Sequence, residues 1–248
     1  MKVLCLADLH VYSFARSVFF IEEIKKVITE EKPDVIAIAG DVFDNKKLNA
    51  YTELAGLGDM PIVFCLGNHE FYQHGGVEKT FEFYKNTKVD NNVHCLDTEG
   101  RIDIDGVSFI GNVLWYDGTT KNFPWPDDII YPGWLDSQIP NFDWKLANKN
   151  CKAAISDGFK NACAKTFLLT HCVPHVKLNK HYFRGSNPFN MYSGVTDLFA
   201  ELSIAPTVSV CGHTHLPAEE VLCGVRCYNI GQDYYGHENK LMFKIVEL

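Results

Sequence analysis

The stretch VIAIAGDVFD (residues 35–44) places a run of apolar residues directly before a polar turn with two aspartates. Apolar runs at 3–6, 62–66, 167–169 and 208–211 also precede polar clusters. Each run is short and almost continuously apolar, which is typical of a strand covered on both faces. The polar residues after these runs are Asp8, His10, Asp41, Asp44, Asn68, His69, Glu70, His171, His213 and His215. The sequence therefore predicts five buried strands that each end in a polar turn.

Segments of helical character follow each of the first three predicted strands. Residues 17–31 carry apolar side chains at the spacing of one helix face and end before Lys32-Pro33. Further helices are expected at about 47–57 and 77–88. Strands that alternate with helices pair in parallel, and the loops after their carboxyl ends converge on one edge. We therefore expect the five polar clusters to open into one crevice.

The residues brought together in this way are oxygen and imidazole donors. The candidate metal ligands are Asp8, His10, Asp41, Asn68, His171, His213 and His215. Such mixed sets suit Mn²⁺, Zn²⁺ or Fe²⁺, and seven donors fit two ions that share a bridging carboxylate better than one tetrahedral ion. Alternation along an extended segment would place His213 and His215 on one side. Taken singly, each cluster could equally be a cap, a turn or a core histidine, but their ordered combination favours a metal site.

In this order, the motifs resemble those of the calcineurin-like metallophosphoesterases, from residue 3 to about residue 231. The resemblance implies an α/β fold, a calcineurin-like four-layer α/β/β/α sandwich with the dimetal site at the carboxyl ends of the strands. It implies one metal held by Asp8, His10, Asp41 and His215, and the other by Asp41, Asn68, His171 and His213. His69 would act outside the ligand set, as the imidazole that protonates the leaving oxygen, with Asp44 holding its orientation.

The reaction implied is hydrolysis of a small phosphomonoester or phosphodiester, with a nucleotide as one candidate. Two divalent ions would activate a shared water for in-line attack, with Mn²⁺ favoured and Fe, Zn or Ni as alternatives. A nuclease of the same family and a catalytically silent scaffold with this fold are the alternative interpretations. Asn45-Lys46 stands where the protein Ser/Thr phosphatases carry Arg-Gly, and the chain has only four arginines, which argues against protein phosphatase activity.

Composition agrees with an enzyme of one domain. With 248 residues, of which 46% are hydrophobic, the chain can form a single domain over residues 1–248. Its net charge of −8 disfavours long nucleic acid and leaves a small phosphorylated substrate as the expected partner. Nine cysteines without C-x-x-C spacing, and no signal peptide, favour reduced thiols and a cytoplasmic location. No apolar stretch approaches the ~20 residues of a membrane span, and the sequence gives no oligomeric state.

The second half of the chain is less regular. Residues 92–114 alternate as strands around the turn Asp105-Gly106 and are expected to continue the same sheet. An aromatic-rich insertion at about 115–145 holds all four tryptophans and is interpreted as a local mini-core or, alternatively, a lid. Helices are expected at 147–164 and from 193–198, and a strand at 240–248. His175 and Arg184 in the loop between are candidate substrate-binding residues, although Arg184 could also be a solvated loop charge.

Overall fold

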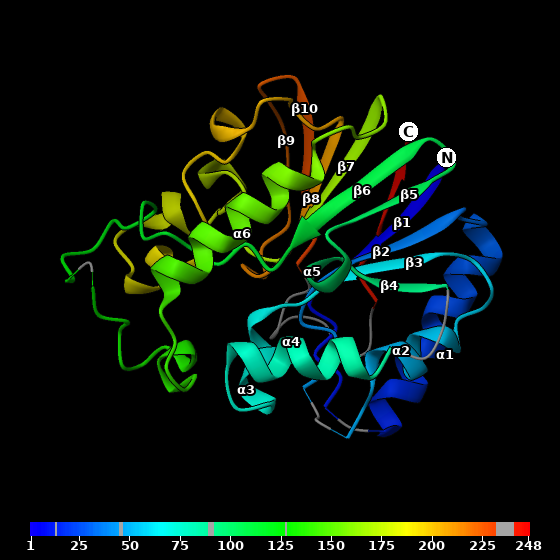
Figure 1. Cartoon of the computed structure of the whole chain (residues 1–248), viewed down its shortest axis with the longest axis horizontal. Coiled ribbons are helices and arrows are strands. Elements are labelled where there is room, and N and C mark those ends of the chain that lie inside the picture. Colours follow the sequence, from blue (N-terminus) through cyan, green and yellow to red (C-terminus); the bar gives the residue numbers. More distant parts are fainter. Residues whose placement is uncertain (13, 45–46, 89–91, 127, 232–240) are drawn as a thin grey trace.

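The structure is a computed structural model, and it describes residues 1–12, 14–44, 47–88, 92–126, 128–231 and 241–248. It contains two sheets stacked face to face, with helices on the outer faces (Figure 1). The strands of the first sheet, in spatial order, are β11 (Lys244–Glu247), β1 (Lys2–Leu6), β2 (Val35–Ala39), β3 (Ile62–Cys65) and β4 (Val93–Cys95). Those of the second are β5 (Arg101–Ile104), β6 (Val107–Asn112), β7 (Lys165–Thr170), β8 (Val208–Cys211), β10 (Val225–Asn229) and β9 (Ala218–Leu222). The predicted α/β/β/α sandwich is thus confirmed.

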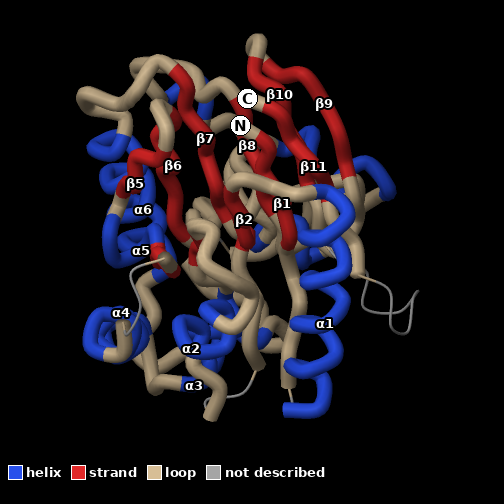
Figure 2. The backbone as a smooth tube through the Cα atoms, turned by 90° about the vertical axis from the view of Figure 1, so that its right-hand side faces the viewer, coloured by secondary structure: helices blue, strands red, loops and turns tan. Residues whose placement is uncertain are grey.

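Helices cover both sheets from outside. Figures 1 and 2 show α1 and α2 on the side of the first sheet, and α6 on the side of the second. The α-helices are α1 (Phe14–Glu31), α2 (Ala50–Ala55), α3 (Asn68–Gln73), α4 (Val77–Asn86), α5 (Leu96–Glu99) and α6 (Trp144–Gly158). Short 3₁₀ segments are η1 (Leu135–Gln138), η2 (Val176–Leu178), η3 (Tyr182–Arg184), η4 (Pro188–Tyr192) and η5 (Phe199–Glu201).

Alternation along the strands builds two apolar cores. Val35 and Ala37 of β2 belong to the core between the sheets, which also contains Phe167 of β7. Ile36 and Ile38, which point the other way, pack in the core that includes the inner face of α1. Because both faces of these strands are buried, their sequences show continuous apolar runs instead of alternation.

Asp97 connects the two sheets. Its carboxylate accepts the backbone N–H of Leu66, just after β3, at 2.7 Å and that of Val113, just after β6, at 2.9 Å. Burial raises the pKa of Asp97 to about 7, although these two donors oppose the shift. A buried carboxylate therefore fixes the ends of strands from different sheets against each other.

Several predicted elements differ from the observed ones. Residues 92–114 do not continue one sheet: β4 joins the first sheet, and the chain then crosses through α5, so that β5 and β6 belong to the second. The turn Asp105-Gly106 is confirmed, with φ of 45° and 78°. Helix α6 begins before residue 147 because the Asp143 side chain accepts the N–H of Leu146 and caps it, and it ends at Gly158.

No α-helix forms in the described segment 193–198. Gly194, with φ of 153°, and Asp197 instead form bridges to Val173 and His175, so this segment runs alongside residues 173–175. The last strand is confined to β11, and the expected start at residue 240 lies outside the described residues, as do Asn45 and Lys46. Cys223 and Cys227 flank the β9–β10 turn and are both free thiols.

Candidate metal centre

The predicted polar clusters converge where the two sheets meet. Asp8 and Asp41 follow β1 and β2 of the first sheet, whereas His171 and His213 follow β7 and β8 of the second. The crevice is therefore formed by two sheets and not by one edge of a single sheet. Non-glycine residues with left-handed backbone are concentrated here: φ is 52° at Asp8, 46° at His10, 50° at Asp41, 72° at His213 and 53° at His215. Such conformations are costly and cluster at functional sites.

Two glycines allow the turns to approach one another. A Cβ atom on Gly40, which has φ of 75°, would lie 2.5 Å from Nδ1 of His171. A Cβ atom on Gly67 would collide with Oδ1 of Asp41. A side chain at either position would displace a candidate ligand, so the close approach of these turns depends on glycine.

Asp41 lies at the middle of the histidine cluster. Its Oδ2 is 3.3 Å from Nε2 of His171, 3.7 Å from Nε2 of His10 and 3.9 Å from Nε2 of His69. Its Oδ1 accepts the backbone N–H of His69 at 3.0 Å. Burial opposes ionisation of Asp41, but the charges of His171, His69 and His10 hold its pKa well below the ordinary value. Asp41 is thus an ionised carboxylate placed between two groups of donors, as a bridging ligand requires.

On one side of Asp41, hydrogen bonds fix the tautomers of two histidines. Nδ1 of His171 donates to the carbonyl of Ala39 at 2.9 Å, so its Nε2 carries the lone pair in the neutral ring. Nε2 of His213 donates to the carbonyl of Tyr192 at 2.9 Å, so the lone pair lies on its Nδ1. These two nitrogens are 3.0 Å apart, and Oδ1 of Asn68 is 2.9 Å from Nε2 of His171.

Four acceptors therefore face one another: Oδ2 of Asp41, Oδ1 of Asn68, Nε2 of His171 and Nδ1 of His213. Burial favours neutral His171, but the charges of Asp41 and Asp8 raise its pKa to about 10. Burial, followed by the charge of His171, lowers the pKa of His213 to about 3. The site thus attracts a positive charge, and this donor set fits a divalent ion, for which a proton on His171 would compete.

On the other side of Asp41, ligand atoms of Asp8, His10 and His215 lie within 4.8 Å of one another. The Asp8 carboxylate is oriented by the backbone N–H of His213, at 3.1 and 2.9 Å from its two oxygens. Nδ1 of His10 bonds to Oδ2 of Asp44 at 3.1 Å, which leaves Nε2 facing Asp41. A second cluster able to hold an ion is therefore present beside the first.

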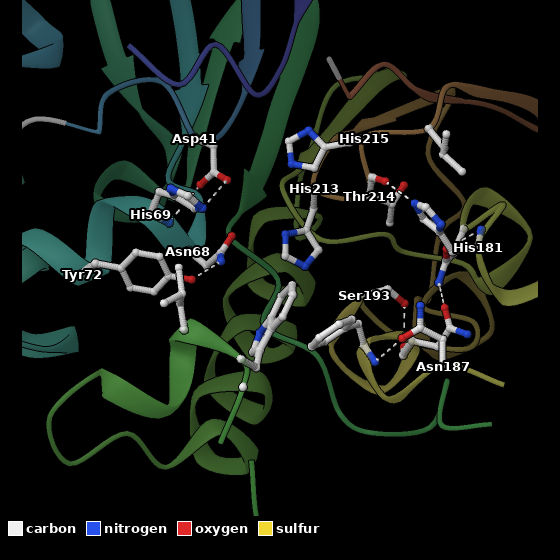
Figure 3. A pocket seen from close by; sticks show the side chains of 17 residues that line it. Asp41, Asn68, His69, Tyr72, His181, Asn187, Ser193, His213, Thr214 and His215 are labelled. Atoms are coloured by element: carbon white, nitrogen blue, oxygen red, sulfur yellow. Dashed lines mark hydrogen bonds and ion pairs between the residues drawn. The ribbon is translucent and has the colours of Figure 1, made fainter. Parts of the chain in front are cut away.

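His69 projects into a pocket beside these clusters (Figure 3). Its Nδ1 bonds to Oδ1 of Asp44 at 2.9 Å, so Nε2 faces the side of Asp41. Burial would lower the pKa of His69, but the charges of Asp41 and Asp44 raise it to about 9. This shift favours the protonated imidazole near neutral pH in the metal-free protein. Asp44 contacts both His10 and His69, whereas the sequence had suggested only the second contact.

A family model for calcineurin-like phosphoesterases matches residues 1–217. The chain belongs to this family. It is accordingly a metal-dependent phosphoesterase, and its histidine and aspartate clusters agree with the dimetal chemistry of calcineurin-like phosphoesterases.

Solved structures share this fold at low sequence identity. A phosphopantetheinyl hydrolase from Mycobacterium tuberculosis is 17% identical, with a TM-score of 0.68 over 94% of this chain and 89% of that one. A dimetal phosphatase from Danio rerio is 12% identical, with a TM-score of 0.55 over 99% and 91%. GAP50, the anchor in the inner membrane complex of Plasmodium, is 14% identical, with a TM-score of 0.53 over 99% and 80%. No curated protein matches the chain.

Two acidic residues of this calcineurin-like phosphoesterase were missed as site residues in the sequence. Glu70 is buried, and its oxygens accept the backbone N–H groups of Asp41, Val42, Phe43 and Gly67. It thereby shapes the turn that carries Asp41. The signal that could have identified it is its position in the Gly-Asn-His-Glu cluster, directly after His69.

Asp136, the second missed residue, comes from the aromatic insertion. Its Oδ1 accepts from Nδ2 of Asn68 at 3.1 Å and from the hydroxyl of Tyr72, while Oδ2 accepts from Nε1 of Trp134 at 2.6 Å. The insertion therefore holds the Asn68 amide with its oxygen toward His171. Its aromatic side chains pack into the main apolar core and not into a separate mini-core, and Phe142 packs against buried Trp115 at a centroid distance of 4.5 Å.

Other site predictions need correction. His213 and His215 do not alternate along an extended segment; both have left-handed backbone in a bend, which directs them into different clusters. Neither candidate substrate-binding residue lines the pocket: Arg184 is exposed, and His175 lies 3.9 Å from Asp197 and stacks on Phe199. The pocket is instead lined by His181 and Asn187, among others.

Proposed function

We propose that this single-domain protein hydrolyses a small phosphomonoester or phosphodiester at a dinuclear metal centre. One ion would be held by Asp8, His10, Asp41 and His215, and the other by Asp41, Asn68, His171 and His213. The observation that carries this proposal is the convergence of lone pairs around Asp41, with the opposite nitrogen of His171 and of His213 bonded to a backbone carbonyl. Two ions bound there would supply Lewis acidity and a hydroxide nucleophile near neutral pH.

The residues around the ions prepare the remaining steps. His69 lines the same pocket as Asp41, which suits donation of a proton from Nε2 to the leaving oxygen. The hydrogen bond from Nδ1 to Asp44 fixes the ring in the orientation needed for this transfer. Glu70 keeps the Asp41 turn in place through its backbone hydrogen bonds.

Manganese is the proposed native metal, with Fe, Zn or Ni as alternatives, because the donor set combines imidazole with oxygen. A cytoplasmic location remains a prediction. Among the described residues, the structure has no helix that combines the length and apolarity needed to cross a membrane.

The test is hydrolysis of bis-p-nitrophenyl phosphate and p-nitrophenyl phosphate by protein loaded in turn with Mn²⁺, Fe²⁺, Zn²⁺ or Ni²⁺. We expect turnover that requires metal, and the preferred substrate identifies diester or monoester chemistry. Asp41→Ala should lose both ions by elemental analysis, whereas Asp157→Ala, on the exposed face of α6, should retain them. Absence of turnover with every metal would favour a silent scaffold, and two ions on Asp41→Ala would reject the bridging role.

A further inference from the structure

The metal clusters open into a cavity of about 470 Å³. One wall consists of Asp41, Asn68, His69, His213 and His215 (Figure 3). The other walls come from the aromatic insertion and from the loops between β7 and β9. This volume lies in the range of about 300–1,000 Å³ that is usual for small-molecule sites. The cavity can therefore hold an organic group attached to a phosphate at the metal clusters.

A second wall of the cavity is apolar. It consists of Trp134 and Leu135 of the insertion, Phe189 of η4 and Leu216. The rings of Trp134 and Phe189 lie 5.2 Å apart, and Trp134 stacks on Tyr192 at 5.7 Å. Trp134 is further fixed by the hydrogen bond from its indole to Asp136. The insertion and η4 thus form one continuous aromatic surface.

Part of this wall is open to solvent. Leu135 is 50% exposed and Phe189 is 39% exposed. An occupant that covers them removes this apolar surface from water, which favours binding. Exposed apolar side chains beside a polar centre are typical of a ligand-binding surface.

Several polar side chains that line the cavity are held by hydrogen bonds. Nε2 of His181 donates to the carbonyl of Thr214 at 2.9 Å. Asn190 bonds to Asn179 and Asn122. Among the lining residues in the described part of the chain there is no lysine or arginine. A substrate anion would therefore be accommodated at the wall formed by the metal clusters and His69.

We infer that the cavity binds the organic group of the substrate, and that this group is uncharged and largely apolar, such as an aryl or heteroaryl alcohol. This inference rests on the proposed phosphoesterase function. It excludes substrates whose organic part carries further phosphates or carboxylates, because burying a second anion against Trp134, Leu135 and Phe189 has no compensating partner there.

The test compares two esters that differ in one remote charge. These are 2-naphthyl phosphate and 6-sulfonato-2-naphthyl phosphate, which have the same ring and similar leaving oxygens. With metal-loaded protein we expect kcat/KM to favour the uncharged ring by at least about tenfold, which corresponds to 1.4 kcal/mol. The difference should lie mainly in KM, because the charge is far from the reacting phosphorus.

A positive charge placed in the cavity should offset this preference. Leu135→Lys puts a cation at a half-exposed position in the wall, and it should move the ratio of kcat/KM at least about tenfold toward the sulfonate. Ile204→Lys is the matched control, since Ile204 is 55% exposed and lies outside the cavity lining. Its ratio should equal that of the unmodified protein. Equal kcat/KM for the two esters, or the same shift in both variants, overturns the inference.

A measurement of binding tests this inference independently of whether the protein hydrolyses the esters. The phosphonate analogues of both esters, which cannot be hydrolysed, are titrated calorimetrically into metal-loaded protein. Tighter binding of the uncharged analogue supports the inference even if no ester is turned over, in which case only the proposed function fails. Equal affinities overturn the inference even if both esters are hydrolysed.

Discussion

The substitution Asp136→Asn should weaken metal binding at the cluster that contains Asn68. Asp136 is fully buried and accepts hydrogen bonds from Asn68, Tyr72 and Trp134. The side chain of asparagine has one oxygen, whereas that of aspartate has two. If that oxygen faces Asn68 and Tyr72, the new amide N–H group faces the Trp134 indole donor; in the flipped orientation it faces the amide of Asn68.

Either orientation therefore leaves a donor pointing at a donor. A buried donor without an acceptor costs about 1–3 kcal/mol, and we expect the free energy of unfolding of metal-free protein to fall by about that amount. Residues that orient a metal ligand typically change metal affinity by about 10–100-fold, which corresponds to about 1.4–2.8 kcal/mol. The expected result is a selective loss of affinity for one of the two ions.

The assay is calorimetric titration of Mn²⁺ into metal-free protein, combined with urea unfolding. Asp143→Asn serves as the matched control, because Asp143 lies in the same insertion and caps α6 by accepting the N–H of Leu146. Asparagine caps helices about as well as aspartate, so affinity and stability should both stay within about 0.5 kcal/mol. Two unchanged Mn²⁺ affinities in Asp136→Asn would show that the Asn68 amide does not depend on the insertion.

Three further predictions concern His69, Glu70 and Asp97. His69→Ala should keep both ions but lose about 10²–10⁴-fold in kcat on an alkyl phosphate, with a smaller loss on p-nitrophenyl phosphate; equal losses on both would exclude a proton donor. Glu70→Gln should lower the free energy of unfolding by about 2–4 kcal/mol, since its amide must face backbone donors of the Asp41 turn; Glu22→Gln, exposed on α1, should change it by under about 0.5 kcal/mol in the same urea titration. Because burial raises the pKa of Asp97 to about 7 from 3.8, the folded state binds more protons between these values, and this group makes stability fall as pH rises from about 4 to 7. Asp97→Asn should remove that part of the slope in unfolding measured across pH, and an unchanged slope would contradict the shift.

The sequence predicted those features that depend on neighbouring residues. Apolar runs followed directly by polar turns identified β1, β2, β3, β7 and β8 together with the residues now clustered around Asp41. The donor types alone were sufficient to suggest metal chemistry. Backbone strain at Asp8 or His213 has no local sequence signal, so the extended geometry assumed for His213 and His215 was wrong.

Features that depend on distant contacts were not predicted. The crossing from β4 to β5 is decided by packing between the sheets and by the contacts of Asp97 with Leu66 and Val113, which lie far apart in the sequence. Asp136 was missed because the insertion has neither helical nor strand periodicity. Residues 193–198 were mistaken for the start of a helix because their bridges to residues 173–175 are nonlocal contacts, which the local sequence does not show.

The candidate ligands come from both sheets, and this has a consequence for folding. An ion that binds Asp41 from one sheet and His171 and His213 from the other binds the native state but no local piece of the unfolded chain. At a free metal concentration of 100 Kd, each such ion would add about 2.7 kcal/mol to the free energy of unfolding. Metal supply would then set the lifetime of the folded protein as well as its rate of turnover, so that scarcity of the ion would expose the inactive apoprotein to unfolding.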